Sequence, residues 1–423
     1  MKPEIKTRLA QIRAGEIPKG YKKGKLGIVP KDWEEKNFSD LFTSTSEYTD
    51  DLEKYPLYSL TIEDGITAKT DRYDRSHLVK KENSYKIVQP NDFAYNPMNI
   101  RFGAVARHKG DIPVAVSGYY DIFTTVHESD LSFMESFLTS DSMITYYNRV
   151  STGSLVEKQR VHFSDFMKFS IPLPPLEERK KIAEILTMQD KVISCCERKI
   201  EQLKHMKKYY LQNMFPKDGE EYPEIRFKGF TDAWEQRKLS DLIKENLKPV
   251  PKPEGEYTRL GIRSHAKGTF HEVVAQGEGL DVDTMYVVEA NNLIVNITFA
   301  WEEAWAITTE RDAEKLVSHR FPQYRFHQGQ CPMFYQYRFR NGRMKYNLEL
   351  ASPGGAGRNR VLNKTEFIKI PVTIPKSYEE QKKIGTFFAR FDDLITLHQR
   401  KCEEEKKKKK AMQQLLLTGI VRV

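Results

Sequence analysis

Residues 177–182 read Glu-Glu-Arg-Lys-Lys-Ile, and residues 379–384 read Glu-Glu-Gln-Lys-Lys-Ile. Five of the six positions agree across a separation of 202 residues. A repeat at a fixed spacing constrains the architecture more firmly than local propensity does, because each copy is expected to build the same structural unit. The two stretches therefore predict a chain made of two similar halves.

Further matches occur in the same order along both halves. The first pair shares Trp-Glu followed by Ser-Asp-Leu, and the fourth is a glycine-containing segment that ends in arginine. The paired segments are 32–41 with 233–242, 92–96 with 292–296, 116–117 with 317–318, 151–160 with 352–360, and 169–174 with 370–375. The last pair is bounded by proline and predicts a strand in each half. The preserved order predicts one large domain followed by one long helix, twice.

Each half ends in a predicted long helix. Residues 177–214 contain no proline or glycine, and their apolar side chains recur at alternating steps of four and three residues. The second helix is predicted from about residue 378 to 417, and a capping box of Ser377 and Glu380 begins it. A single long helix cannot bury such a stripe on its own. The matching registers favour pairing of the two helices, and the alternative is that each folds back on its own domain.

Polar residues interrupt both apolar seams. They are Gln189 and Lys207 in the first helix, and His398, Glu405 and Lys409 in the second. A polar residue at a seam position more often sets the register or is exposed than takes part in catalysis. We therefore assign no chemistry to these positions.

The large domains are predicted to be mixed. Residues 333–340 alternate aromatic with polar side chains, and Asn341-Gly342 follows as a typical hairpin turn. This pattern predicts a strand over 333–340, with strands dominating the later part of each large domain.

The composition is that of a folded protein with more than one core. The chain has 423 residues, 39% of them hydrophobic and 30% charged, with a formal net charge of +9 that favours polyanionic partners. The cysteines at 195, 196, 331 and 402 form neither a disulfide framework nor a zinc-type pair. Without a secretory signal or an apolar run of membrane-spanning length, the sequence predicts a cytoplasmic protein.

Positive charge gathers at corresponding places in the two halves. Residues 69–109 contain nine Lys or Arg against four acids, and residues 311–345 contain eight against two. Cations neutralise DNA phosphates, and arginine can also contact guanine through two hydrogen bonds. The predicted base-contacting residues are Arg72, Arg75, Arg101, Arg263 and Arg338, each with the alternative of an ordinary solvated arginine. The remaining predicted DNA-binding residues are Lys69, Lys80, Lys81, Arg107, Arg160, Arg311, Arg358 and Arg360.

Other motifs do not indicate catalysis. The glycine-containing segments lack the Gly-Lys-Ser/Thr ending of a nucleotide-binding loop, and the histidines form no metal-binding pair. Asn96-Pro97-Met98-Asn99 is similar to a methyltransferase motif but lacks its second proline and its aromatic residue, which favours a structural or DNA-facing turn. The five lysines 406–410 point all round a helix and are typical of a solvated surface. No catalytic or metal-binding residue is predicted.

These features together resemble a known family, the specificity subunits of type I restriction-modification systems. The resemblance is carried by Trp33-Glu34, Trp234-Glu235, the two segments from glycine to arginine, and residues 172–179 and 374–381. It extends over essentially the entire chain. In the second half, residues 371–376 depart from the proline-rich approach to the helix.

The resemblance implies an α+β fold with two mixed α/β target-recognition domains, 1–174 and 216–376. A long helix follows each, within 175–215 and 377–423, and the two helices form an antiparallel coiled coil. Each recognition domain would bind one part of a bipartite, asymmetric target in double-stranded DNA.

The resemblance also implies partners that carry the chemistry. The helices would dock two methyltransferase (modification) subunits that methylate adenine, and restriction/translocase subunits would join that complex. S-adenosylmethionine, ATP and magnesium would belong to those partners, so this chain would hold no cofactor. The alternatives are a specificity subunit of another restriction class, which partners a fused nuclease-methyltransferase, and a non-specific DNA-binding scaffold.

Overall fold

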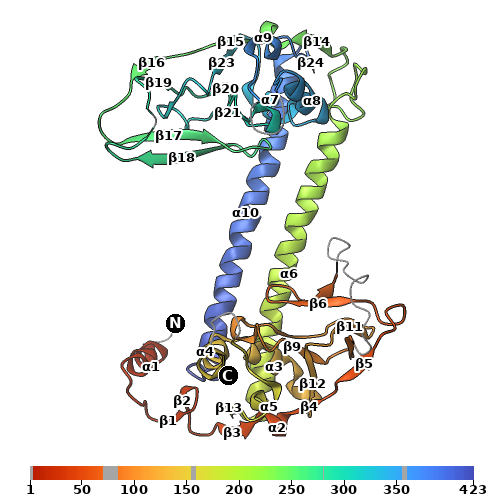
Figure 1. Ribbon diagram of the computed structural model, residues 1–423, viewed down its shortest axis with the longest axis vertical. Coiled ribbons are helices and arrows are strands. Elements are labelled where there is room, and N and C mark those ends of the chain that lie inside the picture. The colour runs from red at the N-terminus through yellow and green to blue at the C-terminus, as the bar shows by residue number, and fades with distance from the viewer. Residues whose placement is uncertain (1–2, 70–83, 154–158, 280, 355–359) are drawn as a thin grey trace. The chain divides into compact units, whose positions relative to one another are not determined.

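The computed structural model describes residues 3–69, 84–153, 159–279, 281–354 and 360–423. Contacts divide the chain into two compact units, which we call unit 1 (1–197 with 401–423) and unit 2 (198–400). Both long helices, α6 (Leu176–Asn213) and α10 (Tyr378–Leu416), contribute one part to each unit (Figure 1). The predicted ranges, 177–214 and 378–417, differ from these helices by at most one residue at either end, so both predicted helices are confirmed.

Unit 1 combines short strands with short helices. Its strands are β1 (Tyr21–Gly24), β2 (Gly27–Pro30), β3 (Glu34–Asn37), β4 (Phe42–Ser44), β5 (Glu47–Thr49), β6 (Tyr58–Thr61), β7 (Gly65–Ala68), β8 (Tyr85–Val88), β9 (Phe93–Tyr95), β10 (Val105–Arg107), β11 (Val114–Ser117), β12 (Asp121–Thr125) and β13 (Ser170–Leu173). Its helices besides α6 and α10 are α1 (Pro3–Arg13), α2 (Phe38–Leu41), α3 (Leu131–Leu138), α4 (Asp141–Val150), α5 (Phe163–Phe166) and the 3-10 turns η3 (Ile100–Phe102) and η4 (Glu128–Asp130).

Unit 2 has a corresponding set of elements. Its strands are β14 (Glu235–Lys238), β15 (Ile243–Glu245), β16 (Pro249–Pro251), β17 (Tyr257–Ile262), β18 (Thr269–Val274), β19 (Thr284–Val287), β20 (Asn292–Val295), β21 (Trp305–Ile307), β22 (Leu316–Val317), β23 (Gln323–Phe326) and β24 (Pro371–Ile374). Its remaining helices are α7 (Pro332–Arg338), α8 (Gly342–Leu350), α9 (Lys364–Phe367) and the 3-10 turns η6 (Leu239–Asp241) and η7 (Ala300–Glu302).

The central sheet repeats in both units. Unit 1 has the strand order β10-β9-β12-β4 and unit 2 the order β21-β20-β23-β15, and all of these neighbours are antiparallel. The inner strands β9 and β20 are buried along their whole length. The same order of strands at equivalent places in the chain confirms the predicted repeat.

In each large domain, the strand that follows the repeated tryptophan pairs with the last strand of the domain. Strand β3 pairs with β13, and β14 pairs with β24, so both predicted proline-bounded strands are confirmed. This pairing brings each repeated tryptophan to the start of a long helix. The indole Nε1 of Trp33 donates to Glu178 Oε2 (3.1 Å), and that of Trp234 donates to Glu380 Oε1 (3.3 Å).

The predicted strand over 333–340 is wrong. Residues 333–338 belong to α7, and 339–340 lie in the turn after it. Asn341 is the N-cap of α8, with its side chain accepting from the backbone N of Met344 (2.8 Å). Proline at the first position of α7 and an Asn N-cap are both helix-start signals. The later parts of the large domains are accordingly helical, with α3, α4 and α5 in unit 1 and α7, α8 and α9 in unit 2.

The predicted capping box at the start of α10 is only half formed. The Ser377 hydroxyl accepts from the backbone N of Glu380 (3.4 Å). The Glu380 carboxylate does not complete the box but accepts from Arg226 (2.7 and 2.9 Å) and from Trp234. The side chain that would cap the helix instead binds the neighbouring segments of unit 2.

The long helices pair antiparallel within each unit. In unit 1, Asp190 pairs with Lys409, and the adjacent Gln189 donates to the Glu405 carboxylate (2.6 Å). In unit 2, Lys207 pairs with Asp392. Four of the five polar seam positions, Gln189, Lys207, Glu405 and Lys409, therefore contact polar groups of the opposite helix, as expected of residues that set a register.

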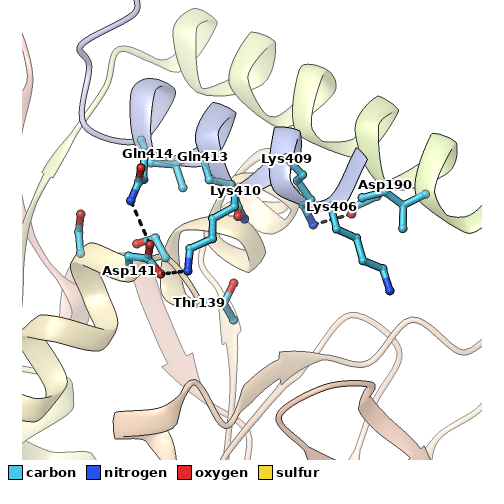
Figure 2. A pocket seen from close by; sticks show the side chains of 12 residues that line it. Thr139, Asp141, Asp190, Lys406, Lys409, Lys410, Gln413 and Gln414 are labelled. Atoms are coloured by element: carbon cyan, nitrogen blue, oxygen red, sulfur yellow. Dashed lines mark hydrogen bonds and ion pairs between the residues drawn. The ribbon is translucent and has the colours of Figure 1, made fainter. Parts of the chain in front are cut away.

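The lysine run 406–410 is divided between solvent and the helix pair. Figure 2 shows Lys409 directed at Asp190, and Lys410 at Asp141 near the start of α4 (3.4 Å). Lys406 pairs with Glu197 (2.9 Å), whereas Lys407 is exposed and has no ion pair with the described residues. The pocket of about 360 Å³ in Figure 2 is lined by lysines that already have acidic partners.

Within the described ranges, every helix is too short or too polar to span a membrane.

Candidate nucleic-acid interface

Strands β17 and β18 form a hairpin, which we call the ribbon, at the edge of the five-stranded sheet β16-β19-β22-β17-β18. The ribbon gives unit 2 an exposed surface of mixed polar and aromatic character. One face of the ribbon buries Leu260 and Ile262 in a hydrophobic cluster. On the other face, Gly261 lies opposite Phe270, and Arg259 lies opposite Glu272. A ribbon of this kind can enter the major groove of DNA.

Arg263 is held at the end of this ribbon by two contacts. Its guanidinium carbon lies 5.1 Å from the centroid of the Phe270 ring, and its Nη1 donates to the Thr269 carbonyl. The Phe270 ring lies directly over Gly261, where an added Cβ would be 2.3 Å from the ring. The glycine thus makes room for an aromatic platform under an exposed arginine.

The inner face of the ribbon is anchored to the loop before β22. Asp312 accepts from the Thr269 hydroxyl (2.7 Å), from His271 Nε2 (2.9 Å) and from the backbone N of Thr309 (2.8 Å). Burial opposes ionisation of Asp312, but these hydrogen bonds outweigh it and hold the pKa of the carboxyl below its usual value. The ionised carboxylate fixes the ribbon, and the neighbouring Arg311 is exposed.

Unit 1 has a shorter hairpin at the equivalent place. Strands β6 and β7 pair over four residues each, and Lys69 is exposed just after β7. The predicted residues Arg72, Arg75, Lys80 and Lys81 lie outside the described residues. The two hairpins therefore differ in length and in side chains, although they occupy the same place in the repeat.

A second repeated feature is the turn after each inner strand. The side chain of Asn96 accepts from the backbone N of Met98 (3.1 Å), and that of Asn296 accepts from the backbone N of Thr298 (3.1 Å). A 3-10 turn follows in both units and ends in a left-handed residue, Gly103 or Glu303. Asn96 is thus engaged in a backbone turn, which supports the structural interpretation of the Asn-Pro segment.

Each 3-10 turn contacts the end of the glycine-containing segment in its unit. In unit 1, Arg101 donates to the side chain of Gln159. In unit 2, Arg360 lies over the Trp301 ring, with its guanidinium carbon 5.3 Å from the centroid. The two pairs occupy equivalent positions, but the arginine is on the turn in unit 1 and on the segment in unit 2. Arg358 lies outside the described residues.

The remaining predicted residues differ in accessibility. Arg160 is exposed and forms a two-way backbone bridge with Thr152 (2.9 and 3.0 Å). Arg107 is paired with Glu135 (2.9 Å). Arg101 is only 9% exposed, and Arg338 donates to the Thr373 carbonyl (2.8 Å) while burial lowers its pKa to about 10.

The structure therefore separates two groups of predicted arginines. Arg160, Arg263 and Arg311 are exposed, whereas Arg101 and Arg338 are engaged inside the protein. The sequence did not single out Arg259 or Phe270. A glycine within an alternating strand pattern is a signal of close approach and could have drawn attention to the Gly261–Phe270 pair.

Residues 30–205 and 232–406 each match the type I restriction modification DNA specificity domain. The chain belongs to this family. It is a DNA specificity subunit, the non-catalytic component of a type I restriction-modification system. The repeat, the α+β fold and the paired long helices are thus those of a type I specificity subunit.

Relatives match over most of the chain. A putative type I restriction enzyme MjaX specificity subunit from Methanocaldococcus jannaschii is 22% identical in an alignment of 428 positions, gaps included, that covers 95% of this chain and 97% of the relative. The type I restriction enzyme MjaVIII specificity subunit of the same organism is 24% identical in an alignment of 226 positions that covers 51% of this chain and 50% of that protein.

Two solved structures share the fold. The S subunit of a type I restriction-modification system from M. genitalium has a TM-score of 0.54 and 11% identity, and covers 92% of this chain and 96% of its own. A chain from a type I system, studied for complex assembly and conformational transition, has a TM-score of 0.51 and 13% identity, and covers 93% of this chain and 99% of its own.

Proposed function

We propose that this specificity subunit binds a bipartite, asymmetric target in double-stranded DNA, with one target-recognition domain, 1–174 or 216–376, on each part. The observation that carries the proposal is the repetition of sheet, turn and hairpin in both units with different side chains on the hairpins. The same scaffold with unequal surfaces suits a protein that binds two unequal sequences.

Two kinds of contact with DNA are expected: contacts to phosphates, which position the protein, and contacts to bases, which give sequence specificity. Arg263 is the leading candidate for base contact in unit 2, because it is exposed and pre-positioned on Phe270. Arg160, Arg311 and Lys69 are exposed cations suited to phosphates. Arg72, Arg75, Lys80, Lys81 and Arg358 remain candidates on sequence grounds.

The long helices, within 175–215 and 377–423, dock two adenine-N6 methyltransferase (modification) subunits, and restriction/translocase subunits join that complex. S-adenosylmethionine, ATP and magnesium belong to those partners. Among the described residues of this chain, no three His, Cys, Asp or Glu side chains are placed to hold a metal ion. The complex works in the cytoplasm, where its DNA target is.

The test is to map methylated adenines across the genome of a host that expresses this chain with its methyltransferase subunit. Residues 230–370 are exchanged for those of a relative with a different target, and residues 40–150 are exchanged in a matched control. The expected motif has two parts, of which the first exchange changes one and the control exchange changes the other. A continuous motif that neither exchange alters would leave only the scaffold function.

A further inference from the structure

A basic pocket of about 610 Å³ lies in unit 2, beside the turn that joins β17 to β18. We use the name basic pocket for this cavity. Lys267 from the turn, Arg340 from the junction between α7 and α8, and Lys345 from α8 line it, together with one carboxylate, that of Glu303. Three cationic side chains from two stretches of the chain, the turn and residues 340–345, thus share one cavity with a single acid.

The walls of the basic pocket are fixed by hydrogen bonds. The backbone N of His265 donates to the Glu302 carbonyl (2.7 Å), and that of Ala266 donates to the Glu303 carbonyl (2.9 Å). Arg340 Nη2 donates to the Ala266 carbonyl (3.1 Å) from the opposite side. The turn, η7 and the α7–α8 junction are therefore held in one arrangement before any ligand binds.

The charge in this cavity is not neutralised within the protein. None of Lys267, Arg340 and Lys345 forms an ion pair with another of the described residues. The Nε of Arg340 is buried and has no hydrogen-bond partner in the described part of the chain. The protein therefore satisfies the Arg340 guanidinium only in part, through its bond to the Ala266 carbonyl, and its positive charge adds to that of the two lysines. The positive end of α8 adds to the same potential.

We propose that the basic pocket binds one backbone phosphate of the DNA half-site contacted by unit 2. This inference rests on the proposed function. Lys267 lies in the same turn as Arg263, between β17 and β18, so a phosphate held here would fix the end of the ribbon that carries the candidate base contact. The pocket positions the ribbon and distinguishes no base.

The test uses the complex of the full chain with its methyltransferase subunits, and the double variant Lys267→Ala with Lys345→Ala. Arg340 is kept, because it also bonds the Ala266 carbonyl. The affinity for target DNA and for unrelated DNA is measured against salt concentration. The loss of one phosphate contact should reduce the slope of log affinity against log salt by about 0.9 on both DNAs. The methylated motif should not change.

A charge-matched control is the pair Lys228→Ala with Lys376→Ala. Both lysines are exposed, belong to unit 2 and do not line the pocket, so the slope should stay that of the unaltered chain. A scan with single neutral methylphosphonate linkages then identifies the phosphate. One position should weaken binding of the unaltered complex and leave the double variant unaffected.

The outcomes separate this inference from the proposed function. If the unaltered complex shows a bipartite motif but the double variant keeps its salt slope, the phosphate site is wrong and the specificity role stands. If the double variant changes one half of the motif, the pocket contacts bases and the proposal fails. A third outcome combines two results: at constant ionic strength inorganic phosphate weakens DNA binding more than chloride does, and no methylphosphonate linkage in the DNA weakens it. In that case the pocket binds free phosphate only, and the proposed contact to a DNA phosphate is wrong.

Discussion

At the scale of single residues, the Gly261–Phe270–Arg263 arrangement predicts how one half of the target is discriminated. In Gly261→Ala, the new Cβ would be 2.3 Å from the Phe270 ring, so the ring must move and Arg263 loses its platform. We expect relaxed discrimination at one position of one half-site, by about 1–3 kcal/mol, as for a lost base contact. Gly255→Ala is the matched control, because its Cβ meets no atom within 4 Å. Methylome sequencing of both variants measures the effect, and equal motifs in the two would contradict it.

Single residues also show where inference from sequence stops. Arg263, Arg101 and Arg338 were all predicted to contact bases, because each has polar neighbours in the sequence. In the structure, however, Arg101 donates to the Gln159 side chain and Arg338 donates to the Thr373 carbonyl. A charge count cannot distinguish these cases, because the partner comes from a segment distant in the sequence. The same holds for the basic pocket, whose cations come from two segments distant in the sequence, the turn at Lys267 and residues 340–345.

At the scale of elements, the lysines 406–410 of α10 include one that pairs with α6 and one that does not. The second can serve as a control when the contribution of the interhelical ion pair is measured. Lys409 pairs with Asp190 of α6 and is 24% exposed, whereas Lys407 is exposed and makes no ion pair with the described residues. We expect Lys409→Ala to lower the free energy of unfolding by about 0.5–1 kcal/mol, and Lys407→Ala to change it by about zero. Denaturant titrations at low and high salt test this, since salt should screen most of the difference. Equal effects of the two substitutions would show that the interhelical pair contributes nothing.

Elements with a long periodic pattern could be predicted, and short ones could not. The seam of α6 extends over several heptads, so its ends agreed to within one residue. The segment 332–338 is shorter than two helical turns, and its alternating aromatics fit a strand equally well. Tertiary packing decides there, because Phe334, Tyr335 and Tyr337 are all buried, which a half-exposed strand would not allow.

At the scale of the whole molecule, each unit has its own hydrophobic cores. Each unit also has its own cluster of one tryptophan, one arginine and one glutamate, which we call its clasp. Every hydrophobic cluster of the described residues belongs to one unit alone. In each clasp a tryptophan and an arginine bind the glutamate at the start of a long helix, Arg422 with Glu178 and Arg226 with Glu380. The sequence repeat revealed the tryptophans and glutamates, but not the arginines, because Arg422 and Arg226 come from segments that do not align.

Because each clasp lies within one unit, we expect a substitution in one clasp to destabilise that unit and to leave the other unit unchanged. Arg226→Ala leaves the carboxylate of Glu380, which is 1% exposed, without its cation, and should destabilise unit 2 by about 3–5 kcal/mol. Arg422→Ala acts on unit 1 and should cost less, about 1–3 kcal/mol, because its side chain is 38% exposed and already partly solvated. Hydrogen exchange distinguishes the effects of the two substitutions, because the opening of one unit exposes only the backbone amides of that unit. We expect faster exchange in β14 and β24 for the first variant, and in β3 and β13 for the second. Acceleration of both pairs of strands by either variant would mean that the chain unfolds as one cooperative body, and the unit that binds one half-site could then not be altered without disturbing the other.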